Sequence, residues 1–435
     1  MSIPVITVGQ SREDLVGGLE RLHGPVTVVR RCAELSELLA ACQSGLARAA
    51  VVAEGSEGLT SSLVDRLSAV GVAIIALTDN PDEAARLRAI GVASALTGVE
   101  SAALSQRIAE AVAQLTGAGP NTAFRSGPAD PGAALRTVEA EPPAGPEEPG
   151  PGRIIAVWGP AGAPGRTTVA ANMAGELAAE GKEVLLVDAD SYGASIAAAL
   201  GLLDESAGLA QACRLADQGL LDREALEKVA VPVATRSGTF SVLTGITRAD
   251  RWTELRAPAL TLVLERARQI AEVVVIDAGF CLEADEELSF DTMAPRRNAA
   301  TLRSLELADA VYAVGAADPV GVPRLVRGLA ELEAAVPQAA PIVVMNRVRA
   351  SSVGRGPERQ LRDAWERYGP ASGLEAFLPF DLAAADAALL GGSLLLEAAP
   401  ESSLRHAIRQ LVCAPAQQKR KSSVFSSTAG RRAKD

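Results

Sequence analysis

Residues 159–168, GPAGAPGRTT, form a glycine-rich turn between an apolar segment and a helix-like one. The apolar run 154–158 (IIAVW) precedes the turn, and residues 169–178 (VAANMAGELA) follow it. A strand, a glycine-rich turn and a helix in this order direct backbone amides and a helix N-terminus at an anion. The turn departs from the phosphate-binding pattern G-x-x-x-x-G-K-[S/T], because Pro160 stands at the first glycine and Arg166 at the lysine. We therefore predict a phosphate site with altered chemistry.

Two further apolar segments lead into aspartates. Residues 184–187 (VLLV) precede Asp188 and Asp190, and residues 273–276 (VVVI) precede Asp277. Parallel sheets bind their ligands at the carboxyl ends of strands, where these side chains would lie. Such an aspartate can hold the water shell of Mg²⁺ while a loop hydroxyl binds the ion, although each aspartate alone can equally be a helix N-cap. Together with the loop, the aspartates predict a nucleotide site.

The segments that position these residues alternate between strand-like and helix-like patterns in two regions. In the second region strands are expected at 154–158, 184–187, 240–243, 273–276, 310–314 and 342–345. In the first region strands are expected at 5–8, 26–29, 50–53, 72–77 and 93–96, with helices such as 12–22 and 34–42 between them. Short apolar strands alternating with helices predict an α/β protein with two doubly wound parallel-sheet domains.

The domain organisation follows from composition. We predict a first domain at 1–117, a disordered linker at 118–152, a second domain at 153–413 and a basic disordered tail at 414–435. Eight of the 25 prolines lie in or directly beside the predicted linker, which favours an extended spacer.

The bulk composition excludes several classes of protein. A net charge of −11 over 435 residues argues against a chain that coats nucleic acid with its whole surface. The five cysteines are scattered without a C-x-x-C pair, so neither a disulfide framework nor a zinc site is indicated. No apolar run of membrane-spanning length occurs. We therefore expect a soluble, cytoplasmic protein whose membrane contact is peripheral at most.

The loop and the aspartates resemble those of the MinD/ParA family of deviant-Walker ATPases, over roughly residues 153–413. That family's loop has the pattern G-K-G-G-x-G-K-T-T, followed by strands that end in D-x-D and in D-x-x-x-G or D-x-A-G. The resemblance implies a homodimer that binds ATP or ADP with Mg²⁺. The phosphate-binding residues that it implies are Gly162, Gly165, Arg166, Thr167 and Thr168.

The same resemblance suggests catalytic and metal-binding roles. Asp190 matches the carboxylate that orients the attacking water, so Asp190 and Arg166 are the implied catalytic residues. Thr167, Asp188 and Asp277 form the implied metal site.

Two later positions match the family's base-binding segments. Asn346, at the end of 342–346 (IVVMN), corresponds to the asparagine that reads the adenine edge. Pro379, within 377–381 (FLPFD), corresponds to the segment that covers the base. The alternatives are a turn or cap residue for Asn346 and a simple loop proline for Pro379.

Three departures from the family pattern lead us to expect nucleotide binding with slow or absent hydrolysis. Ala161 stands at the signature lysine that reaches the partner's nucleotide, and losing one such group commonly slows a reaction about 10²–10³-fold. Pro164 has no amide hydrogen to donate to a phosphate. Arg166 keeps the positive charge, but its planar fork is not equivalent to a lysine.

An unusual segment, 283–298, follows the Asp277 strand. In the family this region senses the terminal phosphate and faces the partner subunit, so Arg296 or Arg297 is a candidate replacement cation. The alternative is a solvated charged loop.

The first domain resembles a response-regulator receiver, on its five strand–helix units and Thr78. It lacks the acidic pair after the first strand, has Ala53-Glu54 at the end of the third, and has no lysine after the fifth. Without those metal-binding carboxylates we do not expect aspartyl-phosphate chemistry. We expect an interaction or dimerisation domain, and the alternative is that Glu54 acts as a fixed mimic of a phosphorylated residue.

The combination of a receiver-like domain without its phosphate acceptor, a linker and an atypical MinD-like ATPase domain resembles the CpaE/TadZ proteins of Tad (Flp) pilus assembly and actinobacterial septum-site proteins. It implies a nucleotide-gated positioning or scaffold protein that recruits pilus, secretion or polar-localisation proteins at a cell pole, septum or inner membrane surface.

The main alternative is an active ParA/MinD-type ATPase in chromosome partitioning or septum-site placement. This ATPase would bind DNA through basic residues, and the candidates are Arg347, Arg349, Arg355, Arg359 and the tail. The net negative charge and the absence of the signature lysine at Ala161 argue against an active, DNA-binding ATPase. Cluster transfer needs paired cysteines, whereas Cys281 stands alone. The basic tail either solubilises the chain or makes a weak contact with anionic lipid.

Overall fold

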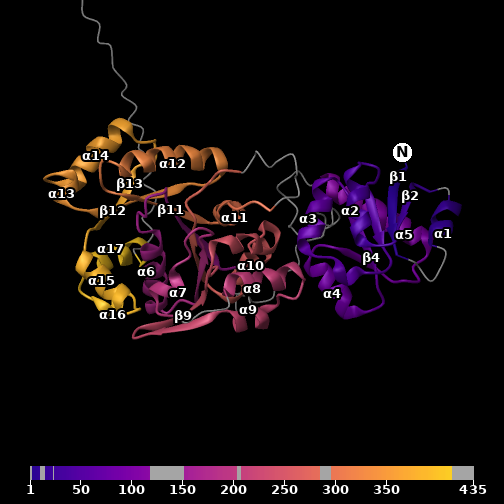
Figure 1. The fold of residues 1–435 in the computed structure, drawn as a ribbon, viewed down its shortest axis with the longest axis horizontal. Coiled ribbons are helices and arrows are strands. Elements are labelled where there is room, and N and C mark those ends of the chain that lie inside the picture. Colours follow the sequence, from indigo (N-terminus) through magenta and orange to yellow (C-terminus); the bar gives the residue numbers. More distant parts are fainter. Residues whose placement is uncertain are drawn as a thin grey trace, which may run out of the picture.

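The computed structural model describes residues 2–9, 15–22, 24–117, 151–202, 207–284 and 295–413. Within these residues the chain forms a five-stranded sheet of order β2-β1-β3-β4-β5 and an eight-stranded sheet of order β13-β12-β11-β6-β10-β7-β9-β8. Each sheet with its helices is called a unit below, and Figure 1 shows the two units side by side. The predicted α/β class with parallel sheets is confirmed. Residues 118–150 of the predicted linker and the predicted tail lie outside the described residues.

The first unit has the strand order of a flavodoxin-like fold. Its strands are β1 (Ile3–Val8), β2 (Val26–Cys32), β3 (Ala49–Val52), β4 (Ala73–Leu77) and β5 (Ala93–Ala95). Its helices are α1 (Leu15–Arg21), α2 (Leu35–Gln43), η1 (Ser56–Gly58), α3 (Ser61–Ala69), α4 (Pro81–Ala89) and α5 (Ser101–Gly117). Alternate residues of β1 point to opposite faces, so Ile6 packs with α2–α4 while Val5 packs with α1 and α5.

The second unit carries the glycine-rich loop. Its strands are β6 (Arg153–Trp158), β7 (Val184–Ala189), β8 (Val231–Thr235), β9 (Gly238–Leu243), β10 (Val273–Ala278), β11 (Ala310–Ala316), β12 (Pro341–Val348) and β13 (Leu374–Pro379). All neighbours pair in parallel except β8, which joins β9 as an antiparallel edge. β8 and β13 have no counterpart among the strands expected from the sequence.

The helices of the second unit cover both faces of its sheet. They are α6 (Arg166–Ala179), α7 (Ile196–Ala199), α8 (Gly208–Asp217), α9 (Arg223–Val229), η3 (Ala249–Glu254), α10 (Ala257–Ile270), α11 (Ala299–Glu306), α12 (Gly321–Ala335), α13 (Ala350–Val353), α14 (Pro357–Tyr368), α15 (Leu382–Leu390), α16 (Leu395–Ala398) and α17 (Ser403–Cys413). One face packs on α6 and α15–α17, and the other on α8–α10, α11, α12 and α14.

Helix α6 is enclosed because α16 and α17 lie over it. All residues from Val169 to Ala178 are buried. The side chain of Asn172 accepts a hydrogen bond from the Leu395 amide at 2.8 Å, and Glu176, 2% exposed, forms an ion pair with Arg405 at 2.7 Å. These contacts, one helical turn apart, fix the middle of the helix that follows the glycine-rich loop against α16 and α17.

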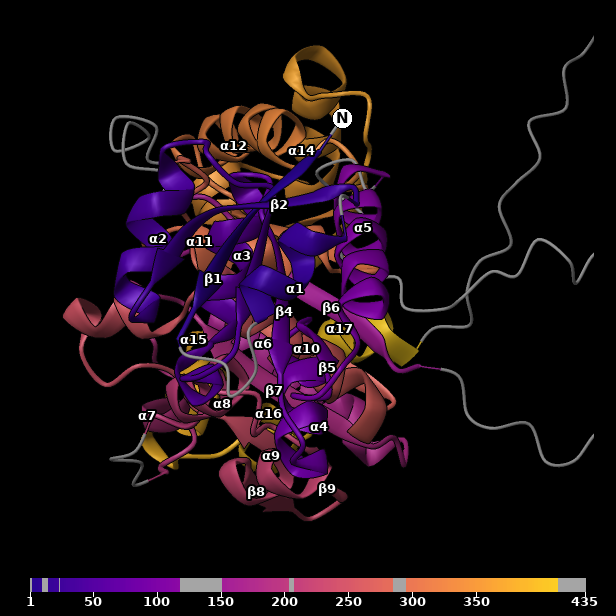
Figure 2. The same cartoon turned by 90° about the vertical axis from the view of Figure 1, so that its right-hand side faces the viewer.

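The two units touch through α3 and α4 of the first and the end of α8 in the second. Asp217 accepts hydrogen bonds from the Ser61 hydroxyl (2.9 Å), the Ser62 hydroxyl (2.6 Å) and the Ser62 amide (2.8 Å). Arg86 of α4 donates to the carbonyl oxygen of Gln218 at 3.0 Å. Figure 2, in which the first unit lies in front of the second, shows the same stacking from the side. The helix-start amides of α3 therefore meet a carboxylate of the other unit.

No helix among the described residues has the length and apolar character needed to cross a membrane.

Candidate functional site

The glycine-rich loop leaves β6 after Trp158 and turns sharply into α6. Its backbone has positive φ at Gly162 (108°), Ala163 (51°) and Gly165 (99°). Glycine adopts this left-handed conformation without strain, whereas Ala163 does so at a cost of about 1–3 kcal/mol. The loop thus has the sharp backbone turns expected of a phosphate cradle, directly before the N-terminus of a buried helix.

Arg166, the first residue of α6, ties the loop to the end of β7. Its guanidinium donates to the carbonyl oxygen of Gly159 at 2.8 Å and to Asp190 at 3.1 Å. The two side chains of the ion pair are 11% and 7% exposed. The structure therefore brings together the two residues predicted to be catalytic, and it places them in contact with each other.

Asp190 uses both carboxylate oxygens. One oxygen pairs with Arg166, and the other accepts from the amides of Tyr192 (2.9 Å) and Gly193 (3.1 Å). These three hydrogen bonds fix the orientation of the Asp190 carboxylate and leave few acceptor sites for a water.

Asp188 lies in β7, two residues before Asp190, and is 1% exposed. Its carboxylate accepts from the amides of Ser195 (2.9 Å) and Ile196 (3.0 Å) at the start of α7, as the helix-cap alternative expects. Burial raises the pKa of Asp188 to about 6, and the Asp190 charge adds to the rise while the Ile196 amide opposes it.

Asp277 is the most exceptional group of the site. It is the penultimate residue of β10, in register with Asp188 on β7, and it is 1% exposed. Neither carboxylate oxygen has a geometrically acceptable hydrogen-bond partner among the described residues. Burial, followed by the Asp188 charge, raises the pKa of Asp277 well above its usual range, while Thr167 and Arg166 oppose the rise. A buried carboxylate without partners is strongly destabilising unless a proton or a cation joins it.

These residues fit a magnesium ion. Thr167 is close enough to Asp277 to lower the pKa of that carboxyl group. The Thr167 hydroxyl and the Asp277 carboxylate, which lacks a hydrogen-bond partner among the described residues, therefore lie side by side. Mg²⁺ is commonly held by one or two carboxylates together with waters and phosphates, rather than by a full protein cage. Accordingly, a cluster of three or more metal-binding side chains is absent from the part of the chain that the structure describes.

The predicted base-binding residues come from β12 and β13. Asn346 donates its amide to the carbonyl oxygen of Pro164 at 2.7 Å and accepts from the Arg347 amide at 2.8 Å. Asn346 thus braces the loop, as a turn residue would, and reading a base edge would require it to exchange these bonds. Pro379 is the last residue of β13, and the Phe380 ring beside it is covered by Arg349, whose guanidinium carbon is 4.6 Å away.

The charged segment 283–298 is described only at its ends. Arg297 places its guanidinium 3.9 Å from the centre of the Tyr192 ring, two residues beyond Asp190. Asn298 accepts from the Tyr192 hydroxyl at 2.9 Å. The end of the segment therefore packs beside the predicted catalytic turn, and the role of Arg296 or Arg297 as a replacement cation stays a prediction.

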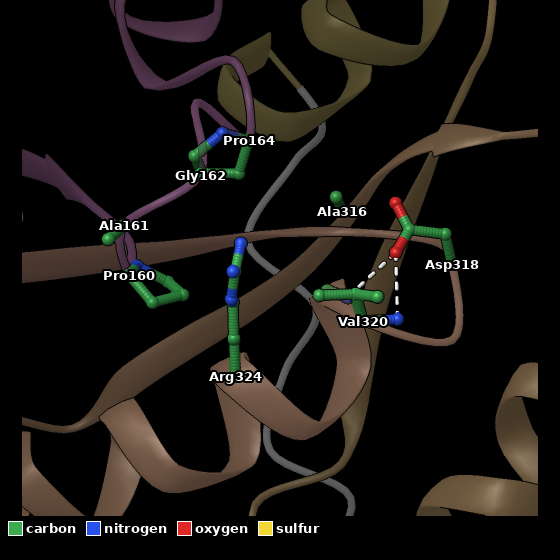
Figure 3. A pocket seen from close by; sticks show the side chains of 9 residues that line it. Pro160, Ala161, Gly162, Pro164, Ala316, Asp318, Val320 and Arg324 are labelled. Carbon is green, nitrogen blue, oxygen red and sulfur yellow. Dashed lines mark hydrogen bonds between the residues drawn. The ribbon is translucent and has the colours of Figure 1, made fainter.

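Arg324 of α12 is a basic residue near the loop that the sequence did not reveal. With Pro160, Ala161, Gly162 and other residues it lines a small pocket of about 90 Å³ (Figure 3). A Cβ atom at Gly162 would lie only 2.5 Å from its guanidinium nitrogen Nη1. Only tertiary packing of α12 brings this side chain to the loop, so no local sequence pattern signals it.

The strand ends of the first unit, where a receiver would have its charged pocket, are closely packed in the part that the structure describes. Gly9, after β1, packs so closely on Glu54 that a Cβ there would lie 2.6 Å from the Glu54 Cβ. After β5, Thr97 hydrogen-bonds to Asp79, with its amide 3.0 Å from that carboxylate. Residues 10–14, where the acidic pair of a receiver would begin, lie outside the described residues.

Comparison with known proteins supports the sequence resemblance of the second unit. Residues 151–232 match the ParA family model, described as NUBPL iron-transfer P-loop NTPase. The comparison with curated proteins gave no match.

Solved structures share the fold of the second unit. A ParA family ATPase from Chlorobium tepidum superposes with a TM-score of 0.50 and 18% identity, over 60% of this chain and 99% of that one. The Pyrococcus furiosus cell division ATPase MinD gives 0.46 and 21%, over 60% and 97%. The septum site-determining protein MinD of Pyrococcus horikoshii, complexed with Mg-ADP, gives 0.45 and 21%, over 60% and 94%. The predicted MinD/ParA-like P-loop fold is confirmed.

Proposed function

We propose that this protein, whose second unit has the MinD/ParA-type P-loop ATPase fold, binds ATP or ADP with Mg²⁺ and uses the nucleotide as a switch for assembly. The observation that carries the proposal is Asp277, a buried carboxylate whose oxygens have no hydrogen-bond partner of acceptable geometry among the described residues, close to Thr167. Thr167, Asp188 and Asp277 are the residues that would hold Mg²⁺. The ion, when bound, would neutralise negative charge on the phosphates and on this buried carboxylate pair.

The loop supplies the phosphate contacts in this proposal. Gly162 and Gly165 have the positive φ of a sharply turning loop, and Thr168 is exposed at the start of α6. Arg166 is placed to grip a phosphate, although it must first give up part of its contact with Asp190 or Gly159. Arginine can hold a phosphate with two parallel hydrogen bonds. The phosphate can therefore replace the acceptor that Arg166 gives up, and the guanidinium keeps its hydrogen bonds.

Slow hydrolysis follows from the state of Asp190. We infer that Arg166 releases Gly159 rather than Asp190 when it grips a phosphate. The Asp190 carboxylate then stays held by Arg166 and by two backbone amides, so little acceptor capacity remains to orient a water. Ala161 also offers no charge where the related ATPases have their signature lysine. We therefore infer a binding switch with slow or absent turnover.

Titration calorimetry with Mg-ATP and Mg-ADP, run beside a phosphate-release assay, tests this function. We expect binding of both nucleotides with slow release of phosphate, and weaker binding in Arg166→Ala. Fast phosphate release that Asp190→Ala abolishes would instead support the active ATPase. Absence of heat for both nucleotides would refute a nucleotide switch.

We further propose a homodimer that positions partner proteins in the manner of the CpaE/TadZ proteins. The first unit supports this role because its α3 and α4 contact the second unit. Pilus, secretion or polar-localisation proteins are the proposed partners, at a cell pole, septum or inner membrane surface. Light scattering with and without Mg-ATP would measure the dimer, and an unchanged monomer mass would contradict it.

The second candidate is an ATPase that binds DNA. Arg347, Arg355 and Arg359 are exposed around α13 and α14, although Arg359 lies 3.9 Å from Asp363. Binding to nonspecific duplex DNA that weakens with salt would support this candidate. No binding at low salt would remove it.

An iron-transfer role is not proposed from the family description. Such a role needs paired cysteines, whereas Cys32, Cys42 and Cys213 are buried and Cys281 stands alone beside the site.

A further inference from the structure

The front of the glycine-rich loop lacks a charge of its own. Ala161 is exposed there and carries no cation, and Arg166 is engaged with Asp190 and Gly159 behind the loop. A nucleoside triphosphate brings several negative charges to such a loop, and a single cation seldom balances them. The structure offers a second cation from another element.

Arg324 lies at the front of the loop because α12 approaches β6 and β11 closely. A Cβ at Gly328 would lie 3.1 Å from the Trp158 ring, and one at Gly315 would lie 2.4 Å from the Leu325 side chain. These two small residues let the helix pack tightly on the sheet, on both sides of Arg324 in the sequence. The position of the Arg324 backbone beside the loop is therefore set by the core.

The guanidinium of Arg324 has room to bind an anion. Figure 3 shows it extending from α12 toward the loop, with Pro160 and Ala161 on one side and Val320 on the other. Its nitrogen Nη1 would be 2.5 Å from a Cβ at Gly162, so it lies directly over the exposed loop backbone. Among the described residues, no carboxylate lies within ion-pair distance of Arg324. Asp318 in the same pocket instead caps the start of α12, accepting from the amides of Val320 (2.9 Å) and Gly321 (2.7 Å).

We propose that Arg324 is a phosphate-binding residue that contacts the terminal phosphate of a bound nucleoside triphosphate. The proposal rests on the nucleotide binding proposed above and adds a residue to that site. Thr168 is a predicted phosphate contact at the α6 end of the loop, whereas Arg324 lies at the opposite end near Gly162, beside the position of the signature lysine that Ala161 replaces. Arg324 thus provides from the same chain a positive charge next to the position that Ala161 leaves neutral.

The experiment compares Mg-ATP and Mg-ADP affinities of the full chain and three variants by calorimetry. The variants are Arg324→Gln, Arg324→Lys and the matched control Arg327→Gln, which changes an exposed arginine one turn further along α12. A charge-assisted hydrogen bond of ordinary strength corresponds to about a 10- to 100-fold loss of affinity.

We expect Arg324→Gln to lose about that factor for Mg-ATP and clearly less for Mg-ADP, because the terminal phosphate is absent from ADP. Arg324→Lys should recover part of the loss, and Arg327→Gln should bind both nucleotides like the wild type. A purely structural role for Arg324 would weaken both nucleotides equally and would not be rescued by lysine.

Equal affinities for the wild type and Arg324→Gln would overturn this assignment and leave the nucleotide switch intact. A wild type that binds neither nucleotide would overturn both.

Discussion

Replacing Asp277 by Asn removes a buried charge at nearly constant side-chain size, and we expect the variant to gain stability relative to the wild type as pH rises. The pKa of Asp277 is raised in the folded protein by burial and by Asp188. Between the ordinary pKa of 3.8 and the raised value, the folded chain holds a proton that the unfolded chain has released. Wild-type stability must therefore fall with increasing pH across that window.

The magnitude follows from proton linkage. One proton corresponds to about 1.4 kcal/mol for each pH unit within the window. Asp188 acts in the same direction, and the rise of its pKa from 3.8 to about 6 corresponds to about 3 kcal/mol in the wild type. Because the charges of Asp188 and Asp277 interact, the difference between wild type and variant reports Asp277 together with its coupling to Asp188.

Urea unfolding between pH 5 and pH 8, in the presence of a chelator, measures this difference. Asp386→Asn, at an exposed position of α15, is the control for losing one carboxylate. The stability of Asp277→Asn minus that of the wild type should increase with pH, and the control should not show this trend. Adding Mg-ATP should reverse the order, because only the wild type keeps the carboxylate that would hold the ion. A pH-independent difference would refute the reasoning about Asp277.

Three further substitutions test the framework of the site. Asp217→Ala removes the acceptor for the Ser62 amide and should speed hydrogen exchange of that amide by an amount equivalent to about 1–3 kcal/mol; unchanged exchange would contradict the contact between the units. Gly165→Ala forces a side chain onto φ of 99° and should lower stability by about 1–3 kcal/mol with loss of nucleotide binding, measured by thermal unfolding and calorimetry. Glu176→Gln breaks the buried pair with Arg405 and should cost about 3–5 kcal/mol in urea unfolding; a loss below about 1 kcal/mol would show that the pair is unimportant.

Much of the second sheet is predictable from sequence because its central strands are buried on both faces. β7 and β10 are continuous apolar runs bounded by polar residues, as central parallel strands are. β8 escapes this pattern because it is an edge strand in which every second residue is exposed, including Pro232. β13 is also an edge strand, and its alternation is interrupted by a register shift against β12.

The convergence of the three aspartates is likewise predictable, since strand ends in a parallel sheet meet at one edge. Their different states are not predictable. Asp190 and Asp188 are satisfied by amides of the following turn and of α7, whereas Asp277 receives none, and only the folded backbone decides this. Asn346 and Arg324 reach the loop from distant segments, so their contacts depend on tertiary packing.

The central claim is that the second unit holds a nucleotide without turning it over rapidly. A single-turnover experiment tests it most directly: excess protein is mixed with radiolabelled ATP and Mg²⁺, and bound ATP and ADP are separated over time. We predict a stable complex in which ATP persists long after binding is complete. Rapid conversion of the bound ATP to ADP, lost in Asp190→Ala, would contradict the account.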